Sequence, residues 1–381
     1  MKKLKGIKFN LDITGMGIVN YAGDEESYIP GLGNMFKNSI YGKKNYYRVI
    51  DKDGNERITS KLKISSNCLR SSLFGESYVA QSASLMHNDD TLYRHLGTDY
   101  AVIRGYLLAS KTVTYKRKSP FTITDAEQVC DAYPIMETCA QSGYKEVAEK
   151  GTIKGKDDKK GVTYYKKNTV GHIKYKSCGT LNLNSLELIS CDQLFDRYGF
   201  NEDYFPLLND NLKLNGITGN LGYYMLNGSV INLAERAFKL DSKSRIKLIK
   251  KQLQRLLDYS IEKNGAYAER EELTVKLTFD AMSDGTWVTI SNSEDIENLL
   301  ADVELFEYYS EVDEKSEILK RATINANMKK DAQKVIDDKA EVAAARKTKK
   351  EEVKLNDTPQ IAVTKIKTTA KKVNTKNTIK A

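Results

Sequence analysis

The chain has few of the residues that build metal sites and disulfide frameworks. It holds three histidines and five cysteines in 381 residues, and no two cysteines form a C-x-x-C pair. An odd number of scattered cysteines is typical of reduced thiols, and so few histidines argue against a zinc site of ordinary spacing. We therefore expect no metal and no other cofactor. The cysteines are Cys68, Cys130, Cys139, Cys178 and Cys191.

Long apolar runs are also missing. No stretch reaches the roughly 18 apolar residues that a membrane-spanning helix requires. The start, Met1 to Gly6, is basic, but Lys8, Asn10 and Asp12 interrupt the apolar core that a signal peptide would need. We expect a cytoplasmic protein with no membrane partner.

Acidic residues are absent from two stretches, the first of which runs from Arg104 to the residue before Asp125. Cations suit phosphates and aromatic faces suit bases, which is the combination that binds single-stranded nucleic acid. The alternative is a solvated hairpin, because lysines on an exposed strand also protect a sheet edge. The stretch contains Arg104, Lys111, Lys116, Arg117 and Lys118, together with Tyr106, Tyr115 and Phe121.

The second acid-free stretch extends from Lys159 to Leu186. Residues 141–161, which lead into it, are polar and contain glycine, so they predict a flexible projection. A basic, aromatic hairpin that projects from a body is suited to clamp a flexible strand. Its cations are Lys159, Lys160, Lys166, Lys167, Lys174 and Lys176, and its aromatic residues are Tyr164, Tyr165 and Tyr175.

A strand that passes directly into a helix is predicted for residues 64–74. Ser66 and Asn67 offer side-chain caps, and the leucine spacing gives the helix a buried face. The amide N–H groups of a first helical turn attract anions, and Arg70 would strengthen that attraction for a phosphate. The alternative is that Ser66 or Asn67 only caps the helix and Arg70 lies in water.

The order of the clearest elements predicts an α+β fold. It is the β-α-β-β-α-β order of ferredoxin-like and RRM domains, so we expect an RRM-like palm with long insertions. One insertion, at about residues 125–178, is expected to form a thumb. Arg104-Gly105-Tyr106 resembles the start of the RRM aromatic motif, which then departs at Leu107. The elements are strand 7–20, helix 66–85, strand 100–114, strand 180–190, helix 243–263 and strand 272–280.

The charge pattern predicts two parts. Residues 1–310 are expected to form the palm with its inserted loops. Residues 311–381 are expected to form a charged helical and then disordered basic tail, because residues 347–381 hold ten lysines and three acids.

In five places the sequence resembles a known family, the crRNA-coating backbone subunit of CRISPR Cascade complexes (RAMP superfamily), and within it the type I-F variant systems. The likeness covers about residues 1–290. The five places are Gly6-Ile7-Lys8 with Gly17-Ile18-Val19-Asn20; Ile64-Ser65 with Asn67-Cys68, Arg70 and Leu73-Phe74; Ile103-Arg104-Gly105-Tyr106 with Lys116-Arg117 and Ser119-Pro120; Gly179 to Ser190 with Asp192 and Phe195-Asp196-Arg197; and Gly265-Ala266-Tyr267 with Thr274-Val275.

This resemblance implies a non-catalytic subunit that polymerises along crRNA, binds its phosphate backbone and presents it for pairing with target DNA. The implied partners are crRNA, target DNA, other copies of itself in a filament, and other Cascade subunits, namely crRNA-end-binding subunits and a helicase-nuclease. The implied RNA-binding residues are Asn67 and Arg70 at phosphates, Arg104, Lys116 and Arg117 in the palm groove, and Lys166 and Lys167 at the base of the thumb. Lys174 of the second acid-free stretch is predicted to bind RNA as well.

Two other functions remain open. Similar subunits of type III complexes are metal-dependent RNA endonucleases that use an Asp between the first strand and the first helix, where this chain has Asp24, Asp51 and Asp53. The run His87–Asp90 could also indicate a metal or acid-base cluster, although a polar loop explains it better. The other alternative is a general single-stranded nucleic-acid-binding protein that does not polymerise.

Overall fold

The computed structural model describes the chain over most of its first 315 residues. The chain divides into two units, residues 1–317 and 318–381, and every described residue lies in the first. The assignment of residues 311–381 to a separate tail therefore stays a prediction. The described residues are 2–21, 28–29, 33–34, 39–40, 42–75, 89–109, 114–131, 135–143, 161–192, 197–229, 234–263, 265–280 and 284–315.

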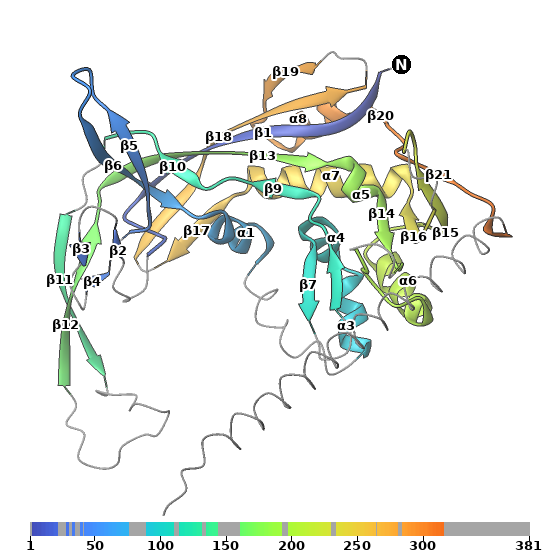
Figure 1. Ribbon diagram of the computed structural model, residues 1–381, viewed down its shortest axis with the longest axis horizontal. Helices are drawn as coiled ribbons and strands as arrows, with labels where there is room; N and C mark the ends of the chain where they lie inside the picture. The colour runs from blue at the N-terminus through green and yellow to red at the C-terminus, as the bar shows by residue number, and fades with distance from the viewer. Residues whose placement is uncertain are drawn as a thin grey trace, which may run out of the picture. The chain divides into compact units, whose positions relative to one another are not determined.

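A large sheet, antiparallel apart from one short strand, organises this unit (Figure 1). Seven of its strands form a continuous hydrogen-bonded order. In spatial order they are β17 (Ser260–Lys263), β18 (Ala266–Phe279), β1 (Lys3–Met16), β13 (His172–Asn182), β10 (Ala126–Gln128), β6 (Glu56–Ile64) and β5 (Lys44–Ile50). Three more strands pair with members of that order: β19 (Asp284–Thr289) lies beside β18, β20 (Glu304–Leu305) runs parallel to β1, and β9 (Phe121–Ile123) lies beside β13.

Strand β1 lies at the centre of the sheet and buries one of its two faces. Alternate residues such as Phe9 and Leu11 are at most 1% exposed, whereas Lys8 between Ile7 and Phe9 is exposed. This is the period-two pattern of a strand with one buried face. Gly15 allows β1 to approach β18 closely, because a Cβ there would collide with the carbonyl oxygen of Tyr267.

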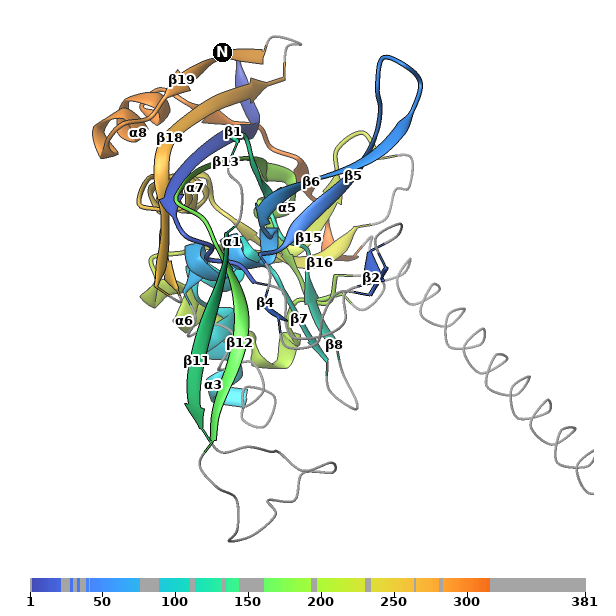
Figure 2. The ribbon, with the colours of Figure 1, turned by 90° about the vertical axis from the view of Figure 1, so that its left-hand side faces the viewer.

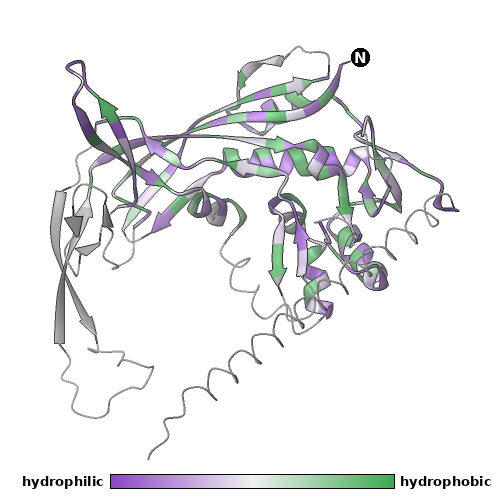
Figure 3. Cartoon of the chain, viewed as in Figure 1, coloured by the Kyte–Doolittle hydropathy of each residue, from purple (hydrophilic) through white to green (hydrophobic). Residues whose placement is uncertain are grey.

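Two helices bury their apolar sides in the same core as β1. They are α1 (Ser66–Phe74) and α7 (Ser242–Leu257), and both lie on the same side of the sheet in Figure 1. Figure 3 shows hydrophobic and hydrophilic residues interleaved along α7, as expected for an amphipathic helix. Asp241 caps α7 by accepting a bond from the amide of Ser244 at 2.7 Å. The prediction of a helix within residues 243–263 is confirmed, although it ends at Leu257 and β17 follows.

Smaller sheets surround this core. One has the strand order β14 (Leu188–Ser190), β16 (Glu235–Leu240), β15 (Gly219–Leu226) and β21 (Tyr309–Glu311). Another joins β11 (Ile135–Gly143), β12 (Gly161–Thr169) and β4 (Ser39–Ile40), and Figure 2 shows β11 and β12 as a long hairpin. The two-stranded sheets are β2 (Tyr28–Ile29) with β3 (Gly33–Asn34), and β7 (Tyr106–Ala109) with β8 (Thr114–Arg117).

The remaining helices are short and pack around these sheets. None of the described helices is long and apolar enough to cross a membrane. They are α3 (Asp89–Leu96), α4 (Asp99–Arg104), α5 (Leu183–Glu187), α6 (Phe205–Leu214), α8 (Ser293–Leu300) and the 3₁₀ helix η1 (Glu202–Tyr204).

A buried ionic cluster ties α7 to α5 and to the segment before β21. Arg245 is 1% exposed and pairs with Glu187 at 3.2 Å and with Glu307. Glu187 also accepts bonds from the amides of Tyr308 and Tyr309. Burial raises the pKa of Glu187, while these amide bonds and Arg245 oppose that rise. The cluster holds a guanidinium in the core because two carboxylates compensate its charge.

The prediction of one central strand at 100–114 is correct only for β7 (Tyr106–Ala109), and β7 pairs with β8 in a two-stranded sheet outside the large one. Residues up to Arg104 form α4, Thr98 caps this helix by accepting a bond from the amide of Ala101, and Gly105 ends it with a φ of 70°. Residues 101–103 are fully buried. Their continuous apolar run therefore shows neither the period of a strand nor that of a helix, and the sequence pattern could not distinguish the two. Because Arg104-Gly105-Tyr106 spans a helix end, it is not the RRM aromatic motif either.

The predicted strand at 180–190 is wrong in its middle. Strand β13 ends at Asn182, whose side chain accepts bonds from the amides of Asn184 and Ser185 and so starts α5. Strands β5 and β6 pair as a hairpin whose turn contains Asp53 and Gly54. The α+β class is confirmed, because the chain combines helices with a large and mostly antiparallel sheet.

Candidate nucleic-acid interface

Helix α1 begins directly after β6, as the sequence predicts, but neither Ser66 nor Asn67 caps it. The N-cap residue is Ser65, and its side chain makes no capping hydrogen bond. Instead Asp125, from the turn between β9 and β10, accepts a bond from the amide of Ser66 at 2.7 Å and pairs with Lys63 at 2.7 Å. The cap is tertiary, so the local sequence could not show it.

The backbone N–H groups of Asn67 and Cys68, in this first turn, have no hydrogen-bond acceptor among the described residues. A cavity of about 470 Å³ opens beside them. First-turn amides carry partial positive charge and form a natural contact for an anion. The residues that line the cavity are Asn20, Lys43, Ser65, Asn67, Cys68, Ser71, Ser72, Gly75, Ser260, Ile261, Glu262 and Lys263.

Two lysines give the cavity its positive charge. Lys43 precedes β5 and Lys263 ends β17, and neither forms an ion pair with a described acid. Burial raises the pKa of the Cys68 thiol, whereas the charges of Lys263 and Lys43 lower it, so both ammonium groups act on this turn. One exposed acid, Glu262, also lines the cavity. Two lysines and one glutamate give the charged side chains of the cavity a net positive charge.

Asn20 adds a buried polar group to the wall. Its side chain is 9% exposed, and its Oδ1 has no hydrogen-bond partner among the described groups. Its carbonyl accepts the amide of Lys43 at 2.9 Å, which holds the end of β1 against the start of β5. A buried amide with an unused atom is suited to a ligand that brings its own hydrogen-bonding group.

Among the predicted RNA-binding residues, the structure brings only Asn67 to this cavity. Arg70 turns inward: its guanidinium donates to the carbonyls of Phe121 and Arg104 at 3.1 and 2.6 Å and to the hydroxyl of Ser119 at 3.2 Å. These three bonds join α1 to α4 and β9. They favour a structural role for Arg70, and its contact with a phosphate stays a prediction.

The predicted palm-groove cations lie elsewhere. Arg104 ends α4 and is half-buried, and Lys116 on β8 is half-buried as well. Arg117 is 6% exposed and donates to three backbone carbonyls. None of the three lines the cavity beside α1.

The predicted thumb cations belong to two different sheets. Lys166 and Lys167 lie on β12, opposite Thr138 and Glu137 of β11, which is the predicted projecting hairpin. Lys174 lies on β13 in the large sheet, where it pairs with Glu271. Their contact with RNA stays a prediction.

Sequence reasoning missed Asn20, Lys43 and Lys263 as site residues. Asn20 belongs only to a family motif in the sequence, Lys43 is followed by Lys44 in a polar stretch, and Lys263 follows the acidic Glu262. Their common location depends on the pairing of β17 with β18 and on the hydrogen bond between Asn20 and Lys43.

The acids considered for an enzyme have local structural roles where they are described. Asp51 accepts bonds from the amides of Asp53 and Asn55 at 2.9 Å, and Asp90 pairs with Arg94 one turn later on α3. Across the described ranges, no three His, Cys, Asp or Glu side chains are grouped to hold a metal ion. Asp24, His87 and Asn88 lie outside the described residues.

A family model described as "Type I-Fv CRISPR-associated protein Cas7fv-like" matches residues 3–284. No curated protein matches. One similar solved structure, "CRISPR RNA-guided surveillance complex", is 10% identical, covers 72% of this chain and 71% of its own, and has a TM-score of 0.30. Another, "CRISPR RNA-guided surveillance complex, pre-nicking", is 8% identical with coverages of 73% and 80% and a TM-score of 0.33. TM-scores this low do not establish a shared fold.

Proposed function

The chain belongs to the type I-Fv CRISPR-associated Cas7fv-like family, and on that premise we propose that it is a non-catalytic backbone subunit of a CRISPR surveillance complex. In this proposal, copies of the protein polymerise along one crRNA. Each copy binds the phosphate backbone and leaves the bases to pair with target DNA.

The cavity beside α1 is the observation that supports RNA-backbone binding most directly. It combines first-turn amides, two lysines without an acidic partner among the described residues, and the buried amide of Asn20. Among the described residues that line it none is aromatic, so these residues offer partners to a phosphate and no stacking surface to a base. A site of this kind positions a strand without reading its sequence.

The sheet supports a ferredoxin-like palm, with a different strand from the predicted one. β1 is antiparallel to both β13 and β18, and β9 and β10 lie on the far side of β13. The order β18-β1-β13-β9/β10, with α1 after the first strand and α7 before the last, matches the ferredoxin-like arrangement. In this proposal β9 and β10 take the place of the predicted strand at 100–114.

The hairpin of β11 and β12 is the proposed thumb, which would contact the RNA between neighbouring copies. Lys166 and Lys167 lie on it, and β12 also pairs with β4. Subunits that bind the crRNA ends and a helicase-nuclease would complete the complex.

Particle mass tests the polymer directly. The protein is co-expressed with guide RNAs of increasing length, and the products are sized by native mass spectrometry. We expect discrete particles that gain whole subunits as the guide lengthens. A fixed complex of one protein and one RNA would exclude polymerisation and favour a general single-strand binder.

A cleavage assay separates the proposal from the type III-like endonuclease. RNA paired to the bound guide is incubated with divalent metal, using the native protein and the Asp24→Ala variant. We expect intact RNA with both. Metal-dependent cuts that disappear in Asp24→Ala would overturn the non-catalytic assignment.

A further inference from the structure

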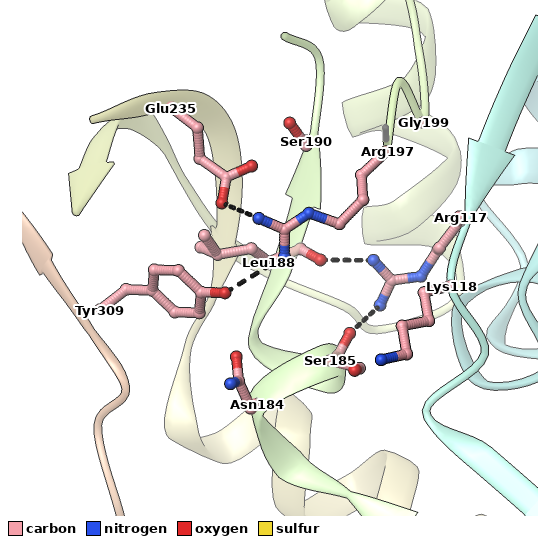
Figure 4. A pocket seen from close by; sticks show the side chains of 10 residues that line it. All are labelled: Arg117, Lys118, Asn184, Ser185, Leu188, Ser190, Arg197, Gly199, Glu235 and Tyr309. Atoms are coloured by element: carbon pink, nitrogen blue, oxygen red, sulfur yellow. Dashed lines mark hydrogen bonds and ion pairs between the residues drawn. The ribbon is translucent and has the colours of Figure 1, made fainter. Parts of the chain in front are cut away.

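A second polar pocket lies between β8, α5 and the strands β14 and β16 (Figure 4). It shares no lining residue with the cavity beside α1. Its walls contain three cations and one acid. The lining residues are Arg117, Lys118, Asn184, Ser185, Leu188, Ser190, Arg197, Gly199, Glu235 and Tyr309.

Arg117 forms the buried end of this pocket and has no acidic partner among the described residues. Its guanidinium donates to the carbonyls of Val102 at 3.0 Å, Ser185 at 3.2 Å and Leu188. These carbonyl oxygens accept bonds from three of its five N–H groups, but none of them carries the full negative charge of a carboxylate. Burial and the nearby charge of Arg197 lower the pKa of Arg117 to about 10, so the guanidinium still carries its charge at neutral pH.

Arg245, a second buried arginine of the same fold, differs from Arg117 because its guanidinium has carboxylate partners. Arg245 is 1% exposed and has Glu187 and Glu307 as partners. A charge removed from water without a counter-ion is costly, and a bound anion would relieve that cost at Arg117. The contrast indicates that the missing negative charge at Arg117 comes from a ligand.

Two further cations surround the pocket. Arg197 donates to Glu235 at 2.8 Å and to the hydroxyl of Tyr309 at 3.4 Å, so Glu235 compensates one of the three cations. Lys118 is exposed and pairs with no described acid, and Figure 4 shows its ammonium group beside Ser185. The three cations and one acid leave two uncompensated positive charges, which match a phosphate group.

The size of the pocket limits what part of a ligand can enter. Its enclosed space is about 20 Å³, which is room for about one water molecule. A base or a sugar is too large, whereas a single phosphoryl oxygen fits. We propose that this pocket binds a phosphate group, with one oxygen inside near Arg117 and the others against Lys118, Asn184 and Arg197.

The proposal stands apart from the guide-RNA function, because it rests on charge compensation and not on family. The phosphate could be free, a terminal monoester or a diester within a strand. Inorganic phosphate, uridine 5′-monophosphate and the dinucleotide UpU separate these sources in parallel titrations.

The test uses two variants that leave Arg117 in place. Lys118→Glu reverses an exposed charge at the pocket, and Asn184→Asp adds a charge without a change in shape. Lys52→Glu makes the same charge change in the exposed β5–β6 turn and serves as the control. Phosphate binding is followed by ³¹P NMR line broadening at constant ionic strength.

We expect the native protein and Lys52→Glu to bind at least one of the three probes with equal affinity. Lys118→Glu and Asn184→Asp should each weaken that binding by about tenfold or more, since like charges at a desolvated site repel strongly. Equal binding by all four proteins would place the phosphate elsewhere and overturn the proposal. Absence of binding of every probe to the native protein would overturn it as well, whatever the RNA-binding assays show.

Discussion

The core around Arg245 and the cavity beside α1 hold their cations in opposite ways. Arg245 forms ion pairs with Glu187 and Glu307, and Glu187 forms a second ion pair with Lys239 at 3.3 Å. Lys43 and Lys263 line an open cavity and pair with no described acid. A cation with internal partners contributes to stability, whereas a cation at a cavity can contribute to ligand binding. Substitutions in the two regions should therefore change different measurements.

The largest effect is expected for Glu187→Gln. Glu187 is fully buried, and its loss leaves Arg245 with only the partly exposed Glu307, so the free energy of unfolding should fall by about 3–5 kcal/mol. Urea denaturation measures this change. Glu297→Gln, which breaks an exposed pair with Lys250, is the control and should cost less than about 1 kcal/mol. Equal losses in the free energy of unfolding for the two variants would contradict the claim that the buried ion pair contributes more to stability than the exposed one.

Arg70→Met should come next and decides to which region Arg70 belongs. Its three internal hydrogen bonds predict a loss of about 2 kcal/mol in the free energy of unfolding and no change in RNA affinity of the folded protein. Arg48→Met on the exposed side of β5 is the control. If RNA affinity falls tenfold while stability is unchanged, Arg70 contacts a phosphate as the sequence predicted.

Asp125→Asn should have a smaller effect that depends on pH. Burial raises the pKa of Asp125, but bonds from Lys63 and the Ser66 amide outweigh this and hold the pKa below its usual 3.8. A lowered folded-state pKa stabilises the protein above the unfolded value, and this stabilisation is lost as the pH falls through the folded value.

At pH 7 the variant should therefore be about 1–2 kcal/mol less stable, because it loses the ion pair with Lys63 and the charge that strengthens the bond from the Ser66 amide. The difference should shrink as the pH falls below 3.8. Urea denaturation from pH 7 to pH 3 measures it, and a difference that does not change with pH would contradict the assigned role of the carboxylate.

Local patterns predicted several elements well. The alternation in β1 and the spacing in α7 were visible because each element buries one face. The start of α1 after β6 was also predicted, and with it the location of Asn67. The run at 101–103 misled because it is buried on every side and so has no period.

The candidate site was harder to predict because tertiary contacts assemble it. Asp125 caps α1 from 59 positions away, and Lys263 reaches the cavity through a short strand that pairs with β18. The basic character of residues 104–118 was visible, but not that Arg117 turns inward to backbone carbonyls. Charge runs show which cations exist, whereas the fold decides which groups each of them contacts.

The salt dependence of RNA binding tests the central claim most directly. Fluorescence anisotropy gives the Kd of a single-stranded RNA between about 50 and 300 mM salt for the native protein, for Lys43→Ala with Lys263→Ala, and for the control Lys213→Ala with Lys243→Ala. Each phosphate contact on a single strand contributes about 0.7 to the slope of log K against log salt, so the loss of two should make the slope shallower by about 1.4. The control should keep the native slope. An unchanged slope in Lys43→Ala with Lys263→Ala would contradict the assignment of this cavity to the RNA backbone.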